Sequence, residues 1–356
     1  MSLKDENKAR RFLWLDFLRG WAALSVIAFH VKGAPVLVFG WNKLWVDFFF
    51  LLSGFVLYPR LTSPTSITSL VRARAVRLFP IALIALTFSF LLESLSFLDE
   101  RLTHHQGLTR AFGESRPLWT LLFAAALMQV FVPASMHWVG ALWTLSAEWW
   151  ANILAIVLKP GRSFNGIYAL LVIGFPLAMY NFISHASGGH IYGLSLLGRS
   201  LTGFTLGMVL RKRYETHAHQ DWAKLSIFTF FAIPTTIWAA WRFSETSGWL
   251  AAELLFPALI WCAATLQNPD SQSFVYKVAK RLGALSFGIY AYQQAIYELL
   301  VLAQRKLILN VNWESTLTIL ILGSVLLSYV SNRYLEPRLS PLIAKVIGVK
   351  TEIDTH

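Results

Sequence analysis

Cysteine and charged residues are scarce in this chain. Its one cysteine in 356 residues, Cys262, lies in an apolar segment, which excludes an intramolecular disulfide framework and a thiolate metal cluster. Only 14% of the residues are charged, against 56% that are hydrophobic and 15% that are aromatic. A soluble domain of this length does not need so much apolar surface. The composition therefore predicts an all-α, polytopic membrane helix bundle.

The chain also lacks the short motifs of common soluble enzymes. It contains no P-loop, dinucleotide fingerprint, HExxH motif or GxSxG motif, and its histidines lack metal-ligand spacing. The net charge is +12, yet no basic arm or nucleic-acid module accompanies it. Lysine and arginine accumulate in the cytoplasmic loops of membrane proteins. The basic balance therefore indicates membrane topology, and we expect no nucleic-acid partner, no metal and no permanently bound cofactor.

About ten apolar stretches are long enough to cross a bilayer, which takes about 20 helical residues. They cover residues 12–32, 44–60, 78–97, 139–158, 166–184, 192–210, 223–241, 248–266, 282–303 and 314–334. A further apolar stretch, 117–132, is short and ends at Pro133. If it does not cross, most Lys and Arg of the loops fall on one side, as the positive-inside rule requires. We therefore expect a re-entrant segment there, cytoplasmic termini, and one membrane domain over 1–356.

The first of these stretches carries polar side chains where they are costly. Asp16 and Arg19 are three residues apart and can pair on one helix face. Arg19 and His30 are eleven apart, which returns to within about 20° of the same face. Ionisable groups inside a membrane helix usually face a protein interior or a wet cavity and indicate function. The alternative is a snorkelling arginine at a helix end and an interfacial histidine.

An arginine cluster precedes Pro80, in the expected cytoplasmic loop between the second and third spans. It consists of Arg72, Arg74 and Arg77. The planar guanidinium group suits phosphate, so the cluster predicts an anion clamp at the cytoplasmic face. A single arginine in such a loop more often serves topology alone.

Further polar residues lie in or beside apolar segments. Ser146 and Glu148 follow Trp143 near the start of the fourth span, where we expect Glu148 to lie at about the depth of His30. An interfacial aromatic belt with a solvated acid is the alternative there. The other candidates of this kind are Asp47, Arg199, Tyr290 and Gln293.

These residues stand in motifs that resemble, over roughly 10–340, the bacterial acyltransferase 3 family of integral membrane O-acyltransferases. In chain order, the motifs are Arg19 and His30 with ten residues between them, VDFFFLLSGF at 46–55, the arginine cluster with Pro80, LWTLSAEWW at 142–150, Arg199 with Phe204 and Gly207, LGALSFGIY at 282–290, and YLEPR at 334–338. The chain departs from the family pattern in two places. Thr144 replaces the first serine of W-S-L-S-x-E, and Gln293 stands where the family usually has a histidine.

The resemblance implies transfer of an acyl group, usually acetyl, from cytoplasmic acyl-CoA to a hydroxyl of an extracytoplasmic glycan such as an exopolysaccharide or O-antigen. It places the chain in a bacterial cytoplasmic (inner) membrane. Some family members carry an extracytoplasmic esterase-like domain, which we do not expect here. The partners implied are acyl-CoA, the glycan and the lipid bilayer, with a second copy of the chain or glycan-assembly proteins as further candidates.

The resemblance also suggests roles for the candidate residues. We expect His30 to act as general base on the acceptor hydroxyl or as a transient acyl carrier, with Glu148 orienting its imidazole. The expected catalytic residues are His30, Glu148, Arg19 and Asp16; those for acetyl-CoA are Arg72, Arg74, Arg77 and Arg199; those for the acceptor are Trp143, Ser146, Asp47, Tyr290 and Gln293. The competing hypothesis is a transporter or flippase of a glycan, a lipid-linked sugar or an acyl-bearing small molecule. The spans show no two-fold repeat in its favour.

Overall fold

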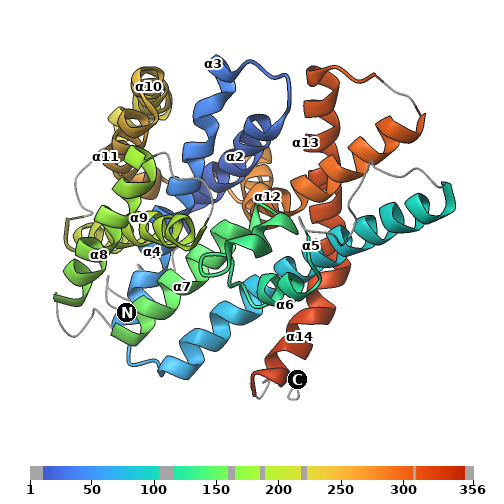
Figure 1. Ribbon diagram of the computed structural model, residues 1–356. Helices are drawn as coiled ribbons and strands as arrows, with labels where there is room; N and C mark the ends of the chain where they lie inside the picture. Colours follow the sequence, from blue (N-terminus) through green and yellow to red (C-terminus); the bar gives the residue numbers. More distant parts are fainter. Residues whose placement is uncertain are drawn as a thin grey trace.

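The computed structural model describes residues 11–103, 112, 116–158, 165–184, 189–217, 223–307 and 310–348, and all regular structure in them is helical (Figure 1). The α-helices are α2 (Leu13–His30), α3 (Val36–Phe39), α4 (Trp45–Thr62), α5 (Ile67–Thr103), α6 (Trp119–Ala125), α7 (Leu142–Leu158), α8 (Asn165–Ser184), α9 (Gly189–His217), α10 (Ala223–Phe243), α11 (Glu245–Thr265), α12 (Phe274–Leu307), α13 (Trp313–Val330) and α14 (Glu336–Val346). Short 3-10 turns occur at η1 (Gly40–Leu44) and η2 (Pro133–His137), and a π-helical turn, η3 (Ser331–Leu335), joins α13 to α14.

Six helical stretches of the described chain are long and apolar enough to cross a membrane. They are Val36–Thr62, Ile67–Asp99, Gly166–Ser184, Ile191–His217, Glu245–Thr265 and Trp313–Val346. Helix α2 is not among them, because Asp16, Arg19 and His30 lower its mean hydropathy. The all-helical membrane fold is thus confirmed. Every stretch expected to cross coincides with a helix, but the count of crossings and the side on which the termini lie stay predictions.

The ambiguous segment 117–132 forms only a short helix. Helix α6 has 7 residues and is therefore about 10 Å long, against about 30 Å for the hydrocarbon core. Turns follow it as far as η2. This agrees with a segment that does not cross.

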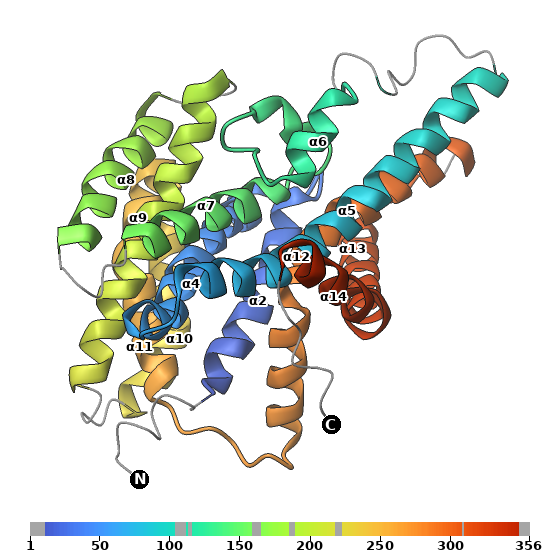
Figure 2. The ribbon, with the colours of Figure 1, turned by 90° about the horizontal axis from the view of Figure 1, so that it is seen from below.

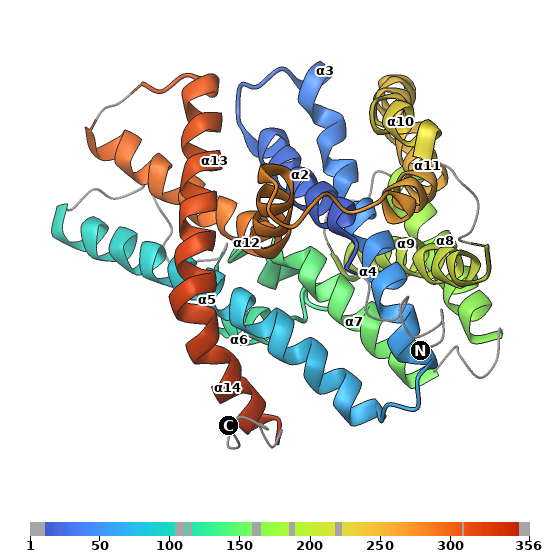
Figure 3. The same ribbon diagram turned by 180° about the vertical axis from the view of Figure 1, so that it is seen from behind.

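We expected the arginine cluster in a loop before the apolar stretch 78–97, but it lies in a helix. Helix α5 begins at Ile67 and continues through Pro80 for 37 residues, so the arginines lie on its first turns. Alanine and arginine favour helix, and neighbouring helices can satisfy the backbone groups that a proline frees in a membrane helix. With α12, the long helix α5 runs towards one corner of the molecule (Figure 3).

Glycines bring α4 and α9 into close contact. A Cβ atom on Gly54 would collide with the backbone of α9, and one on Gly207 with the backbone of α4. Small residues let membrane helices approach in this way. Asp47 lies seven residues before Gly54 and Arg199 eight before Gly207, so both lie on the faces that the glycines bring together.

A second close approach joins α2 to α12, which lie side by side (Figure 2). A Cβ atom on Gly20 would collide with α12, and one on Gly283 with the Asp16 side chain. At this distance Arg19 reaches across to α12, where its Nη2 donates to the Gly283 carbonyl oxygen at 2.5 Å and its Nε to Ser286 Oγ at 2.9 Å. The packing of α2 against α12 therefore fixes the orientation of the Arg19 side chain.

Candidate active site

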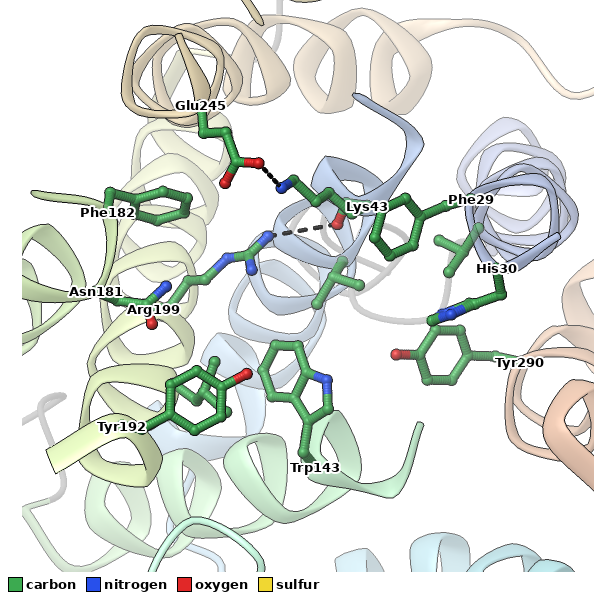
Figure 4. Close-up of a pocket in the computed structure, with 13 residues that line it drawn as sticks. Phe29, His30, Lys43, Trp143, Asn181, Phe182, Tyr192, Arg199, Glu245 and Tyr290 are labelled. Carbon is green, nitrogen blue, oxygen red and sulfur yellow. Dashed lines mark hydrogen bonds and ion pairs between the residues drawn. The ribbon is translucent and has the colours of Figure 1, made fainter. Parts of the chain in front are cut away.

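A large cavity of about 380 Å³ opens at the end of α2. This volume lies in the range of about 300–1,000 Å³ typical of ligand pockets. Its lining contains the aromatic residues Phe29, Trp143, Phe182, Tyr192 and Tyr290 and the polar residues His30, Lys43, Asn181, Arg199 and Glu245 (Figure 4). Trp143 and Tyr290, which we expected to bind the acceptor, both line this cavity.

His30 lies at one end of the large cavity, with Tyr290 beside it (Figure 4). It is the last residue of α2, and its side chain is accessible. Within the described part of the chain, nothing hydrogen-bonds to its ring nitrogens. Both nitrogens are therefore free to meet a substrate.

Arg199, in the wall of the large cavity, forms a buried ion pair with Asp47. Its Nε donates to Asp47 Oδ1 at 2.6 Å and its Nη2 to Oδ2 at 2.5 Å, with side-chain exposures of 8% and 0%. A second buried carboxyl group, that of Glu253 on α11, interacts electrostatically with Arg199. Arg199, which we expected to bind acyl-CoA, is thus paired with Asp47, which we expected to bind the acceptor and which is fully enclosed.

A separate arginine pocket lies between α2, α4, α5, α7 and α12. It is lined by Arg19, Arg74, Arg77, Glu148, Phe49, Leu52, Ser53, Val56 and Phe287. The guanidinium groups of Arg77 and Arg19 lie 4.8 and 5.9 Å from the centre of the Phe287 ring. Ser53 Oγ donates to Glu148 Oε1 at 2.7 Å. Residues distant in sequence thus form one charged site.

Positive charge exceeds negative charge in the arginine pocket. Arg19 pairs with Asp16 at 3.0 Å, as its spacing predicted, but Arg11 shares the same carboxylate at 2.6 Å. Arg74 and Arg77 form no salt bridge with any described residue, and Nε of the buried Arg74 has no hydrogen-bond partner. Under-compensated guanidinium groups of this kind favour an anionic ligand.

A connecting hollow lies between the arginine pocket and the large cavity. It shares Phe49, Glu148 and Phe287 with the pocket and Tyr290 with the cavity. Ser286, which accepts from Arg19, lines it as well. The hollow and the pocket each hold only about 20 Å³, about the space of one water molecule. The arginine pocket and the large cavity are thus linked by shared lining residues. In this conformation the hollow between them is too small to admit a group larger than water.

Two expected members of the site lie elsewhere. Arg72 is absent from the pocket lining, since it points about 200° away from Arg74 around α5, and Arg19 takes its place. Glu148 lines the pocket with Arg19 and neither of the cavities that His30 lines. We expected Glu148 to orient the His30 imidazole, but it lies further along α7 than Trp143, which lines the large cavity.

Ser146 is also placed differently from the prediction. It is fully buried, donates from Oγ to the Leu127 carbonyl oxygen at 2.8 Å and accepts from the Val130 N–H at 3.3 Å. Its hydroxyl therefore holds the turn after α6, and Ser146 does not line the large cavity, the arginine pocket or the connecting hollow.

A side cavity of about 350 Å³ also reaches His30. Its lining is His30, Gly140, Ala141, Gln293, Gln294, Tyr297, Glu298 and Leu320. Gln293, which we expected to bind the acceptor, thus lines a cavity together with His30. Within the described residues, no group of three or more His, Cys, Asp or Glu side chains could hold a metal ion.

Several site residues were not singled out from the sequence. Ser53, Ser286 and Phe287 lie inside motifs that we noted as wholes, so their signal was present but not resolved to single positions. Lys43 and Glu245 form an ion pair at 2.5 Å across the large cavity. They stand about 200 residues apart at helix ends, where no local pattern relates them.

The fold and these sites define a helical membrane protein with an accessible histidine between two cavities and a buried, positively charged pocket. Residues 12–333 match the family model Acyl_transf_3, described as an acyltransferase domain, and the chain belongs to this family. Comparison with curated proteins and with solved structures finds no match.

Proposed function

We propose that the chain is a membrane-bound O-acyltransferase that moves an acyl group, most readily acetyl, from cytoplasmic acyl-CoA to a hydroxyl of an extracytoplasmic glycan in the bacterial inner membrane. One observation carries the proposal. The arginine pocket and the large cavity at His30 are joined by a hollow that shares lining residues with both. This is the arrangement required if an anionic donor enters at the arginines and reacts at the histidine.

The arginine pocket suits the phosphates of the donor. Arg19, Arg74 and Arg77 supply charge-assisted hydrogen bonds, which are about twice as strong as neutral ones. Glu148 then serves as their counter-charge. The pantetheine arm would follow the connecting hollow, and Phe49 and Phe287 would have to move, because the hollow admits only a water-sized group. Acetyl-CoA is thus a donor substrate and not a resident cofactor.

The large cavity suits a carbohydrate acceptor. Its aromatic side chains offer flat apolar faces to a sugar ring, while Asn181, Lys43 and Glu245 offer donors and acceptors for hydroxyl groups. A ring seated there would present a hydroxyl to His30.

His30 then acts as general base. Its free ring nitrogen takes the proton of the acceptor hydroxyl while the oxygen attacks the thioester carbonyl carbon. The tetrahedral intermediate expels the CoA thiolate, which takes the proton back from the imidazolium. The products are an acyl ester and free CoA, and the histidine returns to its neutral form.

The test is acetyl transfer by the purified protein in detergent micelles with labelled acetyl-CoA. His30→Ala should lower transfer at least about a hundredfold, the usual contribution of a general base. It should keep the thermal stabilisation that acetyl-CoA confers on the parent, because the arginine pocket is intact. His137→Ala is the matched control, since His137 is exposed on η2 and lines neither cavity.

Two results would contradict the proposal. Near-normal transfer by a folded His30→Ala variant would remove the histidine from the mechanism. Thermal stabilisation of the parent by free sugars but not by acetyl-CoA would favour a transporter instead. In the source bacterium, deletion of the gene should remove an acetyl increment from a surface glycan, measured by mass analysis.

A further inference from the structure

The side cavity meets the large cavity only at His30. Of the described residues that line them, His30 is the single one that both share. At about 350 Å³ the side cavity is nearly as large as its neighbour. A substrate seated at His30 therefore has a second space beside it that the transfer reaction does not itself require.

Hydrogen bonds hold most of the polar wall of the side cavity in place. Gln294 Oε1 accepts from the Gly140 N–H, and its Nε2 donates to Glu298 Oε1 at 3.0 Å. Arg116 binds the same Glu298 oxygen at 2.5 Å and Glu93 at 2.8 Å. These groups are hydrogen-bonded within the protein, and Glu298 shares the charge of Arg116 with Glu93, so negative charge remains on this wall.

Gln293 differs from these residues because one of its polar atoms has no hydrogen-bond partner. Its Nε2 donates to the Tyr290 carbonyl oxygen at 3.0 Å, which settles the orientation of the amide. Its Oε1 is buried and has no hydrogen-bond partner, although the residue is only 3% exposed. A buried acceptor of this kind is normally paired. Gln293 lines the side cavity, so a turn of its side chain would offer this unpaired acceptor to a ligand O–H.

We propose that the side cavity binds a second sugar residue of the acceptor, adjacent to the one acylated at His30, with Gln293 Oε1 accepting a hydrogen bond from one of its hydroxyls. This inference rests on the proposed function. An acyl chain would leave the buried Oε1 of Gln293 without a hydrogen-bond donor. An anionic group would meet Glu298 and no lining lysine or arginine. A glutamine cannot carry a proton at neutral pH, so its contribution is binding.

The experiment compares monosaccharide with disaccharide acceptors. The probes are the methyl glycosides of glucose, galactose, mannose and N-acetylglucosamine, each beside a disaccharide that ends in the same sugar. With labelled acetyl-CoA and the purified full chain, the disaccharide of the accepted sugar should give the higher kcat/KM. Gln293→Leu, which removes the acceptor, and Ala141→Leu, which fills the cavity, should each lower the disaccharide-to-monosaccharide ratio about tenfold.

Two further variants and one further donor complete the test. Asn181→Leu, in the large cavity, should lower kcat/KM for the monosaccharide and for the disaccharide by the same factor. Gln272→Leu, at an exposed position in the segment before α12, should leave the disaccharide-to-monosaccharide ratio unchanged. A ratio that survives in Gln293→Leu and Ala141→Leu would overturn the inference alone. So would a changed preference between butyryl-CoA and acetyl-CoA in place of a changed ratio. Transfer to no saccharide by the wild-type chain would overturn the proposed function as well.

Discussion

Two buried arginines of this protein have nearly the same exposure and opposite electrostatic surroundings. Arg199 is 6% exposed and Arg74 is 5% exposed. Arg199 binds both oxygens of Asp47, whereas Arg74 has no salt bridge within the described chain and an unpartnered Nε. Burying a charge is costly unless it is paired. Arg199 is therefore compensated within the protein, and Arg74 has the arrangement expected of a group that binds an anion.

The contrast separates two uses of arginine that sequence alone treats alike. Both residues lie in apolar surroundings, and both were expected to bind acyl-CoA. The two arginines are equally buried, and what distinguishes them in the structure is the partner carboxylate of Arg199. The predictions below test that distinction in order of decreasing effect.

The largest effect is expected from breaking the Asp47–Arg199 pair. Asp47→Ala leaves a buried guanidinium group with less compensation and should destabilise the protein by about 3–5 kcal/mol. Thermal unfolding in detergent measures this. The double variant Asp47→Ala, Arg199→Leu should recover most of the loss, because the uncompensated guanidinium group is then absent. An Asp47→Ala variant as stable as the parent would show that the pair is not structural.

Arg74→Met should behave in the opposite way. It removes a cation without leaving a buried carboxylate unpaired, so the midpoint of thermal unfolding should not fall. Loss of a charge-assisted contact to phosphate, worth about 1.5–3 kcal/mol, should raise KM for acetyl-CoA about tenfold to a hundredfold. Arg72→Met on the same helix is the control and should leave KM unchanged. If Arg72→Met raises KM as much as Arg74→Met, the pocket has been assigned wrongly.

Glu148→Gln should sharpen the comparison by making the arginine pocket more positive. Removal of its counter-charge should tighten acetyl-CoA binding by about threefold, as for a partly screened interaction. Titration calorimetry with acetyl-CoA measures the Kd. An unchanged Kd with a much lower kcat would mean that Glu148 acts on the chemistry at His30, as the sequence had suggested.

The smallest effect is expected at the rim of the large cavity. Lys43 and Glu245 also form an ion pair, but their side chains are 22% and 50% exposed. Lys43→Met should therefore change the free energy of unfolding by less than about 1 kcal/mol. A loss as large as that in Asp47→Ala would show that exposure does not separate these two pairs.

Much of the local structure followed from the sequence. Apolar stretches located the helices, and spacing predicted the Asp16–Arg19 pair. The arginine cluster was predicted as an anion clamp but misplaced in a loop, because the apolar stretch begins only at residue 78 whereas the helix begins at Ile67. Arg72 was included because the cluster was treated as a unit, whereas helical geometry turns Arg72 away from Arg74.

The Arg19–His30 stretch and the family motifs thus sufficed to predict an all-helical membrane protein of an acyltransferase family, because hydropathy and helical periodicity are local properties of the chain. Only the tertiary structure decided which charges are compensated. Asp47 and Arg199 lie 152 residues apart and meet because Gly54 and Gly207 let α4 and α9 approach. Glu148 joins Arg19 and Arg74 because α2, α5 and α7 pack together. Such pairings depend on helix contacts between distant segments, which no pattern along one segment contains.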